Sequence, residues 1–171
     1  MPKLSDKLIN NSLALFAVIT KDFMNLHEFL TINKSIIAEE ATESLHRAEL
    51  KSYKSSPIIE NKNRIEKLLE LTISGVDNRT LFGMTEYSEK VANERFTAGF
   101  DLHEVHTAFN VLEETIWKKV VENFPASELG NALGLISTVL GAGKETLALT
   151  YVSLASKRKT STLNLSGLFG G

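Results

Sequence analysis

The sequence predicts an all-α protein of about six helices, and three observations carry that prediction. Only three prolines occur, at Pro2, Pro57 and Pro125, and the last two fall at natural breaks between helical segments. No run alternates apolar and polar residues around an Asn-Gly or Asp-Gly turn, which is the usual signature of a β-hairpin. Apolar residues instead recur at spacings of three and four. With 171 residues, 43% of them hydrophobic, the chain can bury one core.

Composition and charge exclude several classes of protein. The formal net charge of −2 gives no broad attraction to nucleic acid or to anionic lipid. The chain has no cysteine, which excludes disulfides, Cys-ligated zinc, iron–sulfur clusters and a thiol nucleophile. No secretory signal is visible, and the apolar runs are shorter than the roughly 18 residues of a membrane span. We therefore expect a cytoplasmic protein with no nucleic-acid or membrane partner.

The first half of the chain predicts four helices. Apolar residues place the first at about 5–30, and a polar segment predicts the second. The stretch SYKSSP then forms the clearest linker. We expect Gly75 to follow the end of the third helix and Gly99 to follow the end of the fourth, because glycine is common just beyond a helix. The second, third and fourth helices are expected at about 34–53, 57–75 and 80–98.

The fifth helix is the most strongly marked. Asp101 is a good N-cap, and Glu104 three residues later completes an Asp variant of the capping box. His106 lies at the edge of the core stripe that follows, whereas His103 falls on the polar side. Trp117 flanks the stripe and is interpreted as a packing residue. The stripe itself consists of Leu102, Val105, Phe109, Leu112, Ile116 and Val120.

The sixth helix, from about Ser127 to Lys159, carries a seven-residue repeat. Leucine recurs every seven residues, and the residue after each leucine is small, so another backbone could approach closely. Two interpretations stay open: the central helix of a monomeric bundle, or a subunit interface of a homodimer. Each glycine inside a helix costs about 1 kcal/mol relative to alanine. The presence of such glycines therefore indicates close helix packing, which both interpretations provide. The repeat consists of Leu133, Gly134, Leu140, Gly141, Leu147, Ala148, Leu154 and Ala155.

Candidate chemical sites are few. The string GAGKET at 141–146 lacks the earlier glycine and the Ser or Thr that a phosphate-binding loop needs, so we interpret it as helix. His103 and His106 could supply two metal ligands but need a third, and no metal site is predicted. The leading prediction includes no cofactor. The alternative is a haem or another small apolar ligand, with His106 as the likeliest axial ligand and His27 next.

Catalytic signatures are missing from the sequence. It contains no Gly-x-Ser-x-Gly elbow, no HExxH and no repeated Glu-x-x-His pair. Adjacent carboxylates such as Glu113 and Glu114 point in different directions on a helix and are interpreted as surface charge. Arg95 is expected to pair with a nearby carboxylate or helix C-terminus. We therefore predict that the protein is not an enzyme.

The run NERFTAGFDLHEVHTAFNVLEETIWKKVVEN and the terminal LALTYVSLASKRK resemble the RsbRD-type N-terminal domain. The similarity covers about residues 58–158, with Arg95, Gly99 and Trp117 at matching positions. It implies an all-helical, globin-like sensory domain of the kind found in bacterial stressosome co-antagonists, which dimerise and lack haem. The family's output module has no counterpart in this sequence.

Taken together, the sequence predicts one all-helical regulatory domain over residues 1–159, followed by a short apolar tail at 160–171. The expected function is bacterial signal transduction, such as stress-response regulation, by homodimerisation and binding to a separate, unidentified protein partner.

Overall fold

The computed structural model describes residues 25–161, and within that range the chain is all-α with no strand. The prediction of an all-α bundle is confirmed. The described elements are α2 (Leu26–Ile32), α3 (Lys34–Arg47), α4 (Lys51–Lys54), α5 (Ile58–Asn78), α6 (Phe82–Thr97), α7 (Leu102–Asn123) and α8 (Ala126–Ser161).

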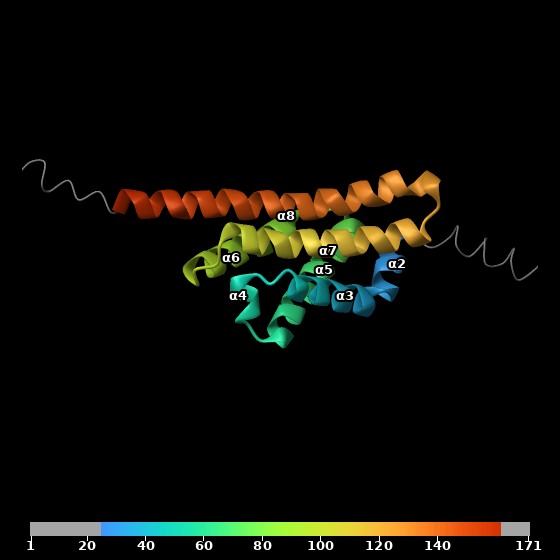
Figure 1. Cartoon of the computed structure of the whole chain (residues 1–171). Helices are drawn as coiled ribbons and strands as arrows, with labels where there is room; N and C mark the ends of the chain where they lie inside the picture. The colour runs from blue at the N-terminus through green and yellow to red at the C-terminus, as the bar shows by residue number, and fades with distance from the viewer. Residues whose placement is uncertain (1–24, 162–171) are drawn as a thin grey trace, which may run out of the picture.

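Two long antiparallel helices, α7 and α8, form one side of the bundle. They run side by side from a short connection at Phe124 and Pro125, and α8 continues past the ends of α6 and α7 (Figure 1). α8 packs on α6 and α7, while α3 packs on α5 and α7 from the other side. The short α2 and α4 close the two ends of α3 and contact α5 and α7, respectively.

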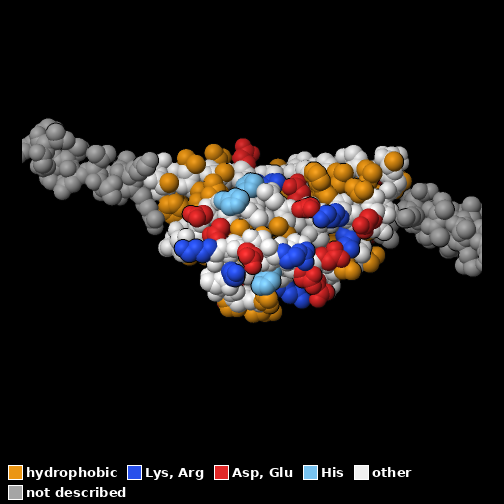
Figure 2. All heavy atoms as spheres, in the orientation of Figure 1, with side chains coloured by type: hydrophobic (Ala, Val, Ile, Leu, Met, Phe, Trp, Pro, Cys, Tyr) orange, Lys and Arg blue, Asp and Glu red, His pale blue; other side chains and the backbone are white. Residues whose placement is uncertain are grey.

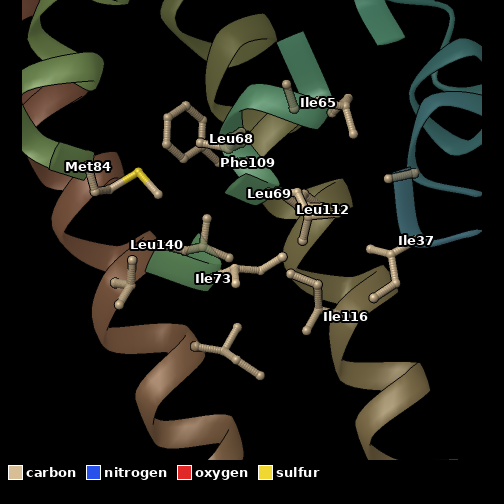
Figure 3. Close-up of a cluster of buried hydrophobic side chains, with 14 of the residues drawn as sticks. Ile37, Ile65, Leu68, Leu69, Ile73, Met84, Phe109, Leu112, Ile116 and Leu140 are labelled. Carbon is tan, nitrogen blue, oxygen red and sulfur yellow. The ribbon is translucent and has the colours of Figure 1, made fainter. Parts of the chain in front are cut away.

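One core lies between these helices. Figure 3 shows apolar side chains from α3, α5, α6, α7 and α8 pointing toward a common centre. The stripe predicted on the fifth helix forms the part of the core that α7 contributes. Five of its residues are buried: Val105, Phe109, Leu112, Ile116 and Val120. Burying such side chains contributes about 1.5–3 kcal/mol each relative to leaving them exposed. The core includes Ile37, Leu69, Met84, Leu112, Ile116 and Leu140.

Two glycines allow the closest helix approaches in the core. A Cβ on Gly143 of α8 would lie 2.8–2.9 Å from atoms of Phe109, Met84 and Ser88. A Cβ on Gly75 of α5 would lie 2.8 Å from Cγ1 of Val139. Neither position has room for a side chain, so these two notches fix how deeply α8 sits against α5, α6 and α7.

Several predicted boundaries differ from the structure. The helix expected at 34–53 is broken, because Glu49 adopts a left-handed backbone with φ of 50° and separates α3 from α4. The third helix continues through Gly75 and ends at Arg79, which is the left-handed residue there. Gly75 is therefore a packing glycine rather than a terminator. Gly99 does follow α6 with φ of 81°, as predicted.

The N-terminal end also begins differently. Asn25 caps α2, and Glu28 closes a capping box with it, so a new helix starts at Leu26 where one continuous helix at 5–30 was expected. Residues 5–24 of the predicted first helix lie outside the described residues. At the other end, α8 continues to Ser161, past the predicted boundary at 159, and the rest of the tail predicted at 160–171 lies outside the described residues. The fifth helix begins at Leu102 after the Asp101 cap, as predicted.

Candidate functional site

The seven-residue repeat of α8 divides between two faces of the helix. Leu140 and Leu147 are fully buried in the chain's own core, and Leu133 and Leu154 are half-buried. The small residues that follow them turn away from the core: Gly134 and Ala155 are exposed, and Gly141 and Ala148 are half-buried. The leucine row thus serves the intramolecular core, and only the row of small residues faces outward.

The outward face of α8 is apolar and open. Leu149 is 65% exposed and Val152 is 61% exposed. A Cβ on Gly134 or Gly141 would meet no atom within 4 Å, so these glycines leave a shallow, uncovered strip. Thr138 on this face donates its hydroxyl hydrogen to the carbonyl of Gly134 at 2.8 Å. Because this hydrogen bond lies within the helix, the Thr138 hydroxyl needs no donor or acceptor from outside α8.

The outer surface continues onto α7. Trp117, interpreted from sequence as a packing residue, is 41% exposed, and Val121 one turn later is also exposed. Lys144 of α8 donates to the Glu113 carboxylate of α7 at 2.6 Å, closing the seam between the two helices. Figure 2 shows hydrophobic side chains in two areas along the edge formed by α8, separated by charged and histidine side chains. We call Trp117, Val121, Gly134, Thr138, Gly141, Leu149 and Val152 the outer surface.

By length and composition, Ala126–Lys157 is the one helix among the described residues that could cross a membrane. A helix buried in a protein core meets the same criterion, and the inner side of α8 is buried in the core of this chain.

The two candidate haem ligands lie apart, on different sides of the bundle. His106 faces the α7–α8 seam, where its Nδ1 lies 3.1 Å from Nδ2 of Asn110. Burial, Lys144 and His103 hold the pKa of His106 below its usual range. His27 lies 3.8 Å from the Asp77 carboxylate, beside a cavity of about 280 Å³ whose walls include Asp77, Arg79 and Glu128. Charged walls do not match the apolar ring of haem.

A second arrangement of polar groups lies at the opposite side of α7 from the outer surface. A cavity of about 30 Å³ is enclosed by residues of α3, α4, α5, α6 and α7. Its polar side chains are Tyr53, Arg64, Tyr87 and Arg95; of these only Tyr53 is buried, at 5% exposure. We call it the arginine–tyrosine cavity. Its apolar walls are Leu45, Ile65, Leu68, Val91, Val105, Ala108 and Phe109.

Short polar contacts hold the elements around this cavity. Glu104 of α7 accepts hydrogen bonds from the Ser52 N–H at 2.8 Å and the Ser52 hydroxyl at 2.6 Å, which fixes α4 against α7. Asn61 donates to the Tyr53 carbonyl at 2.9 Å. Burial would raise the pKa of Glu104, but the bonds from Ser52 and the Asp101 N–H outweigh it and hold that pKa below its usual range.

Arg95 is positioned by an aromatic ring. Its guanidinium lies 4.8 Å from the ring centroid of Phe100, in place of the carboxylate or helix C-terminus expected from sequence. Arg64 donates to Asn61 at 2.9 Å and to Glu60 at 3.0 Å. Arg64 and Arg95 line the same cavity, and burial followed by the charge of Arg95 lowers the pKa of Arg64.

Sequence reasoning missed this cavity. Arg95 was noted, but Tyr53, Arg64 and Tyr87 carry no spacing pattern, because each comes from a different helix. The one local indication in the sequence is Arg95, which lies close to the aromatic residues Tyr87, Phe96 and Phe100. Among the described residues, no three His, Asp or Glu side chains gather in a way that could hold a metal ion.

No family model, curated protein or solved structure matches the chain. The similarity to the RsbRD-type domain and the globin-like arrangement therefore stay predictions.

Proposed function

We propose that the chain is a non-catalytic bacterial regulatory domain that forms a homodimer through its outer surface and passes a signal to a separate protein partner. The exposed apolar strip on α8 is the single observation that carries the proposal. Covering apolar area is favourable by about 25 cal/mol per Å², and exposed apolar patches bordered by polar residues commonly mark interaction sites.

The charge of α8 favours a second copy of this chain as the occupant. Between Glu128 and Lys157 the helix carries only two charged residues, Lys144 and Glu145. Lys144 is already paired with Glu113, so Glu145 is the one charge on α8 in that interval without a pairing within the described chain. In a two-fold interface each surface meets itself, so like-charge repulsion on α8 is limited to the exposed Glu145, which lies between Gly141 and Leu149 on the same face. The open strip at Gly134 and Gly141 would let two helices approach closely.

The proposal places the protein in the cytoplasm, as a signalling domain whose partner binds elsewhere on the dimer. A stress-response role rests on the resemblance to the RsbRD-type domain alone. We do not extend the haem alternative, because His106 faces the helix seam and the cavity beside His27 has charged walls.

Native mass spectrometry and Gly141→Leu test the dimer. The wild type is expected as an apo dimer. Gly141→Leu is expected as a folded monomer with an unchanged helical circular dichroism spectrum, because a Cβ at this position has no neighbouring atom within 4 Å. Asn63→Leu, an added leucine on the exposed side of α5, is the control and should stay dimeric.

Three outcomes would count against the proposal. One is a monomeric wild type, and another is a Gly141→Leu variant that stays dimeric. The third is a monomer that floats with lipid vesicles, which would assign the outer surface to a membrane. A retained haem mass would instead restore the ligand-sensor alternative.

A further inference from the structure

We propose that the arginine–tyrosine cavity is a binding site for a small planar monoanion, of the carboxylate, bicarbonate or nitrate type. The site is separate from the outer surface, and the proposal does not depend on dimerisation. It is carried by the hydrogen-bonding groups that face the cavity, by their charge and by the size of the space.

The polar groups of the cavity are all donors. Guanidinium groups donate and cannot accept hydrogen bonds. Burial raises the pKa of Tyr53 to about 12 and also raises that of Tyr87, so both phenols keep their protons. Within residues 25–161, neither phenol and no guanidinium nitrogen of Arg95 makes a hydrogen bond, although Arg95 stacks on Phe100. These donors reach solvent, since Ser88 Oγ is the one fully buried polar side-chain atom of the described residues without a partner, and a ligand rich in acceptors can replace the water that they meet.

One of the two guanidinium groups at the cavity has no carboxylate partner. Arg64 is paired with Glu60 at 3.0 Å. The nearest buried carboxylate, Glu104, is engaged by Ser52 and the Asp101 N–H and does not pair with Arg95. Among the described residues Arg95 pairs with no carboxylate, so its guanidinium is the cationic group at the cavity that can pair with a ligand. A monoanion would neutralise it, and a guanidinium fork presents two parallel N–H groups to a planar oxyanion.

The space and its walls exclude larger and more strongly hydrated anions. A water needs about 10–15 Å³ of such space, so the cavity of about 30 Å³ holds about two waters or one small planar ion. Apolar side chains make up most of the wall, and removing a dianion such as phosphate from water into such a place is costly. Solvent reaches the cavity at Arg64, Tyr87 and Arg95, the three half-buried lining residues, which form its entrance.

The test is a titration of the ¹⁵N-labelled full chain with sodium formate, bicarbonate or nitrate at constant ionic strength. The Arg95 side-chain Nε–Hε signal and the backbone amides of Tyr53, Val91 and Phe109 report binding. We expect saturable shifts with at least one planar monoanion and none with chloride or phosphate. The anion whose chemical-shift changes saturate at the lowest concentration is the preferred ligand of the cavity.

Variants separate binding from folding. Arg95→Gln should weaken binding about tenfold or more, since a charge-assisted hydrogen bond is lost. Arg95→Lys keeps the charge but loses the fork and should weaken binding less. Tyr53→Phe should weaken it by a smaller factor, and Lys90→Gln, an exposed charge on the same helix, should leave it unchanged.

Two results would overturn the proposal. The first is an absence of saturable shifts with every planar anion in the folded wild type, which would mean that the cavity holds only water. The second is an equal response to chloride, or an equal response in Arg95→Gln, which would mean that the anions act on the general surface charge.

Discussion

The two faces of α8 carry similar residues for different purposes. On the inner face, Gly143 is a notch that Phe109, Met84 and Ser88 fill. On the outer face, Gly141, only two residues earlier, meets nothing within 4 Å. Leu147 is fully buried, whereas Leu149 is largely exposed. Residue type along a helix thus gives no measure of its energetic importance until the neighbouring helices are placed.

The largest expected difference between the faces concerns the two leucines. Leu147→Ala should destabilise the fold by about 3 kcal/mol, because it removes buried methylene groups and leaves a cavity. Leu149→Ala should change the free energy of unfolding by less than about 0.5 kcal/mol at protein concentrations low enough for the monomer. Urea denaturation of both variants measures this. Equal losses would mean that the outer face is packed within the chain itself.

The two glycines give the next largest difference. Gly143→Val should cost about 2 kcal/mol, since its side chain overpacks against Phe109 and Ser88. Gly141→Val should be neutral or slightly stabilising in the monomer, because valine is the better helix former and the site is open. Urea denaturation at the same low protein concentration measures both variants. The midpoint of Gly143→Val should lie below that of the wild type, and the midpoint of Gly141→Val should equal it or lie slightly above it. If Gly143→Val matched the wild type, the notch would not be rigid.

A smaller effect lies at the Arg79 end of α5, beside the Gly75 notch. Arg79 has φ of 53°, a left-handed conformation that costs an L-residue about 1–2 kcal/mol. Arg79→Gly should raise the free energy of unfolding by up to about 1 kcal/mol, while Gly75→Ala should lower it. Thermal unfolding of both variants measures these effects. Arg79→Gly introduces a glycine that relieves backbone strain, and Gly75→Ala removes a glycine that leaves space for Val139. A destabilised Arg79→Gly would mean that the side chain of Arg79 makes a stabilising contact.

The smallest effect concerns the border between the two faces, where His106 lies near Lys144. Burial, Lys144 and His103 lower the pKa of His106, so the folded state disfavours its protonated form. Stability should therefore be lost as pH falls below the unfolded value of about 6.5 toward the folded one. Lys144→Met removes one of these causes and should raise the pKa of His106, as measured by NMR titration of the imidazole. An unchanged pKa would leave burial and His103 as its causes.

The sequence predicts the fold class well because the periodic stripe of α7 and the caps at Asp101 and Gly99 are local signals. It fails at Gly75 and Glu49. Glycine at 75 favours a helix end locally, but contact with Val139 on a distant helix retains it inside α5. Glu49 breaks the predicted second helix although glutamate is a good helix former. Tertiary packing decides the first position, and nothing in the local sequence around Glu49 marks the second.

The site residues show the same limit. The repeat on α8 was visible as a pattern, yet its leucines and its small residues face opposite ways, which depends on where α6 and α7 lie. The arginine–tyrosine cavity has no pattern to detect, since Tyr53, Arg64, Tyr87 and Arg95 meet only through the packing of three helices, α4, α5 and α6.

The extension of α8 past the bundle has a mechanical consequence. Tyr151 is the last buried residue of α8 up to Lys157, and its hydroxyl donates to the Phe100 carbonyl at 3.2 Å. The backbone then remains helical through Ser161, which at 1.5 Å per residue carries it about 15 Å further. A rigid rod held at Tyr151 and in the Gly143 notch acts as a lever arm. Any tilt of α8 about Tyr151 would therefore be carried undiminished along the helix to its last described turn at Ser161.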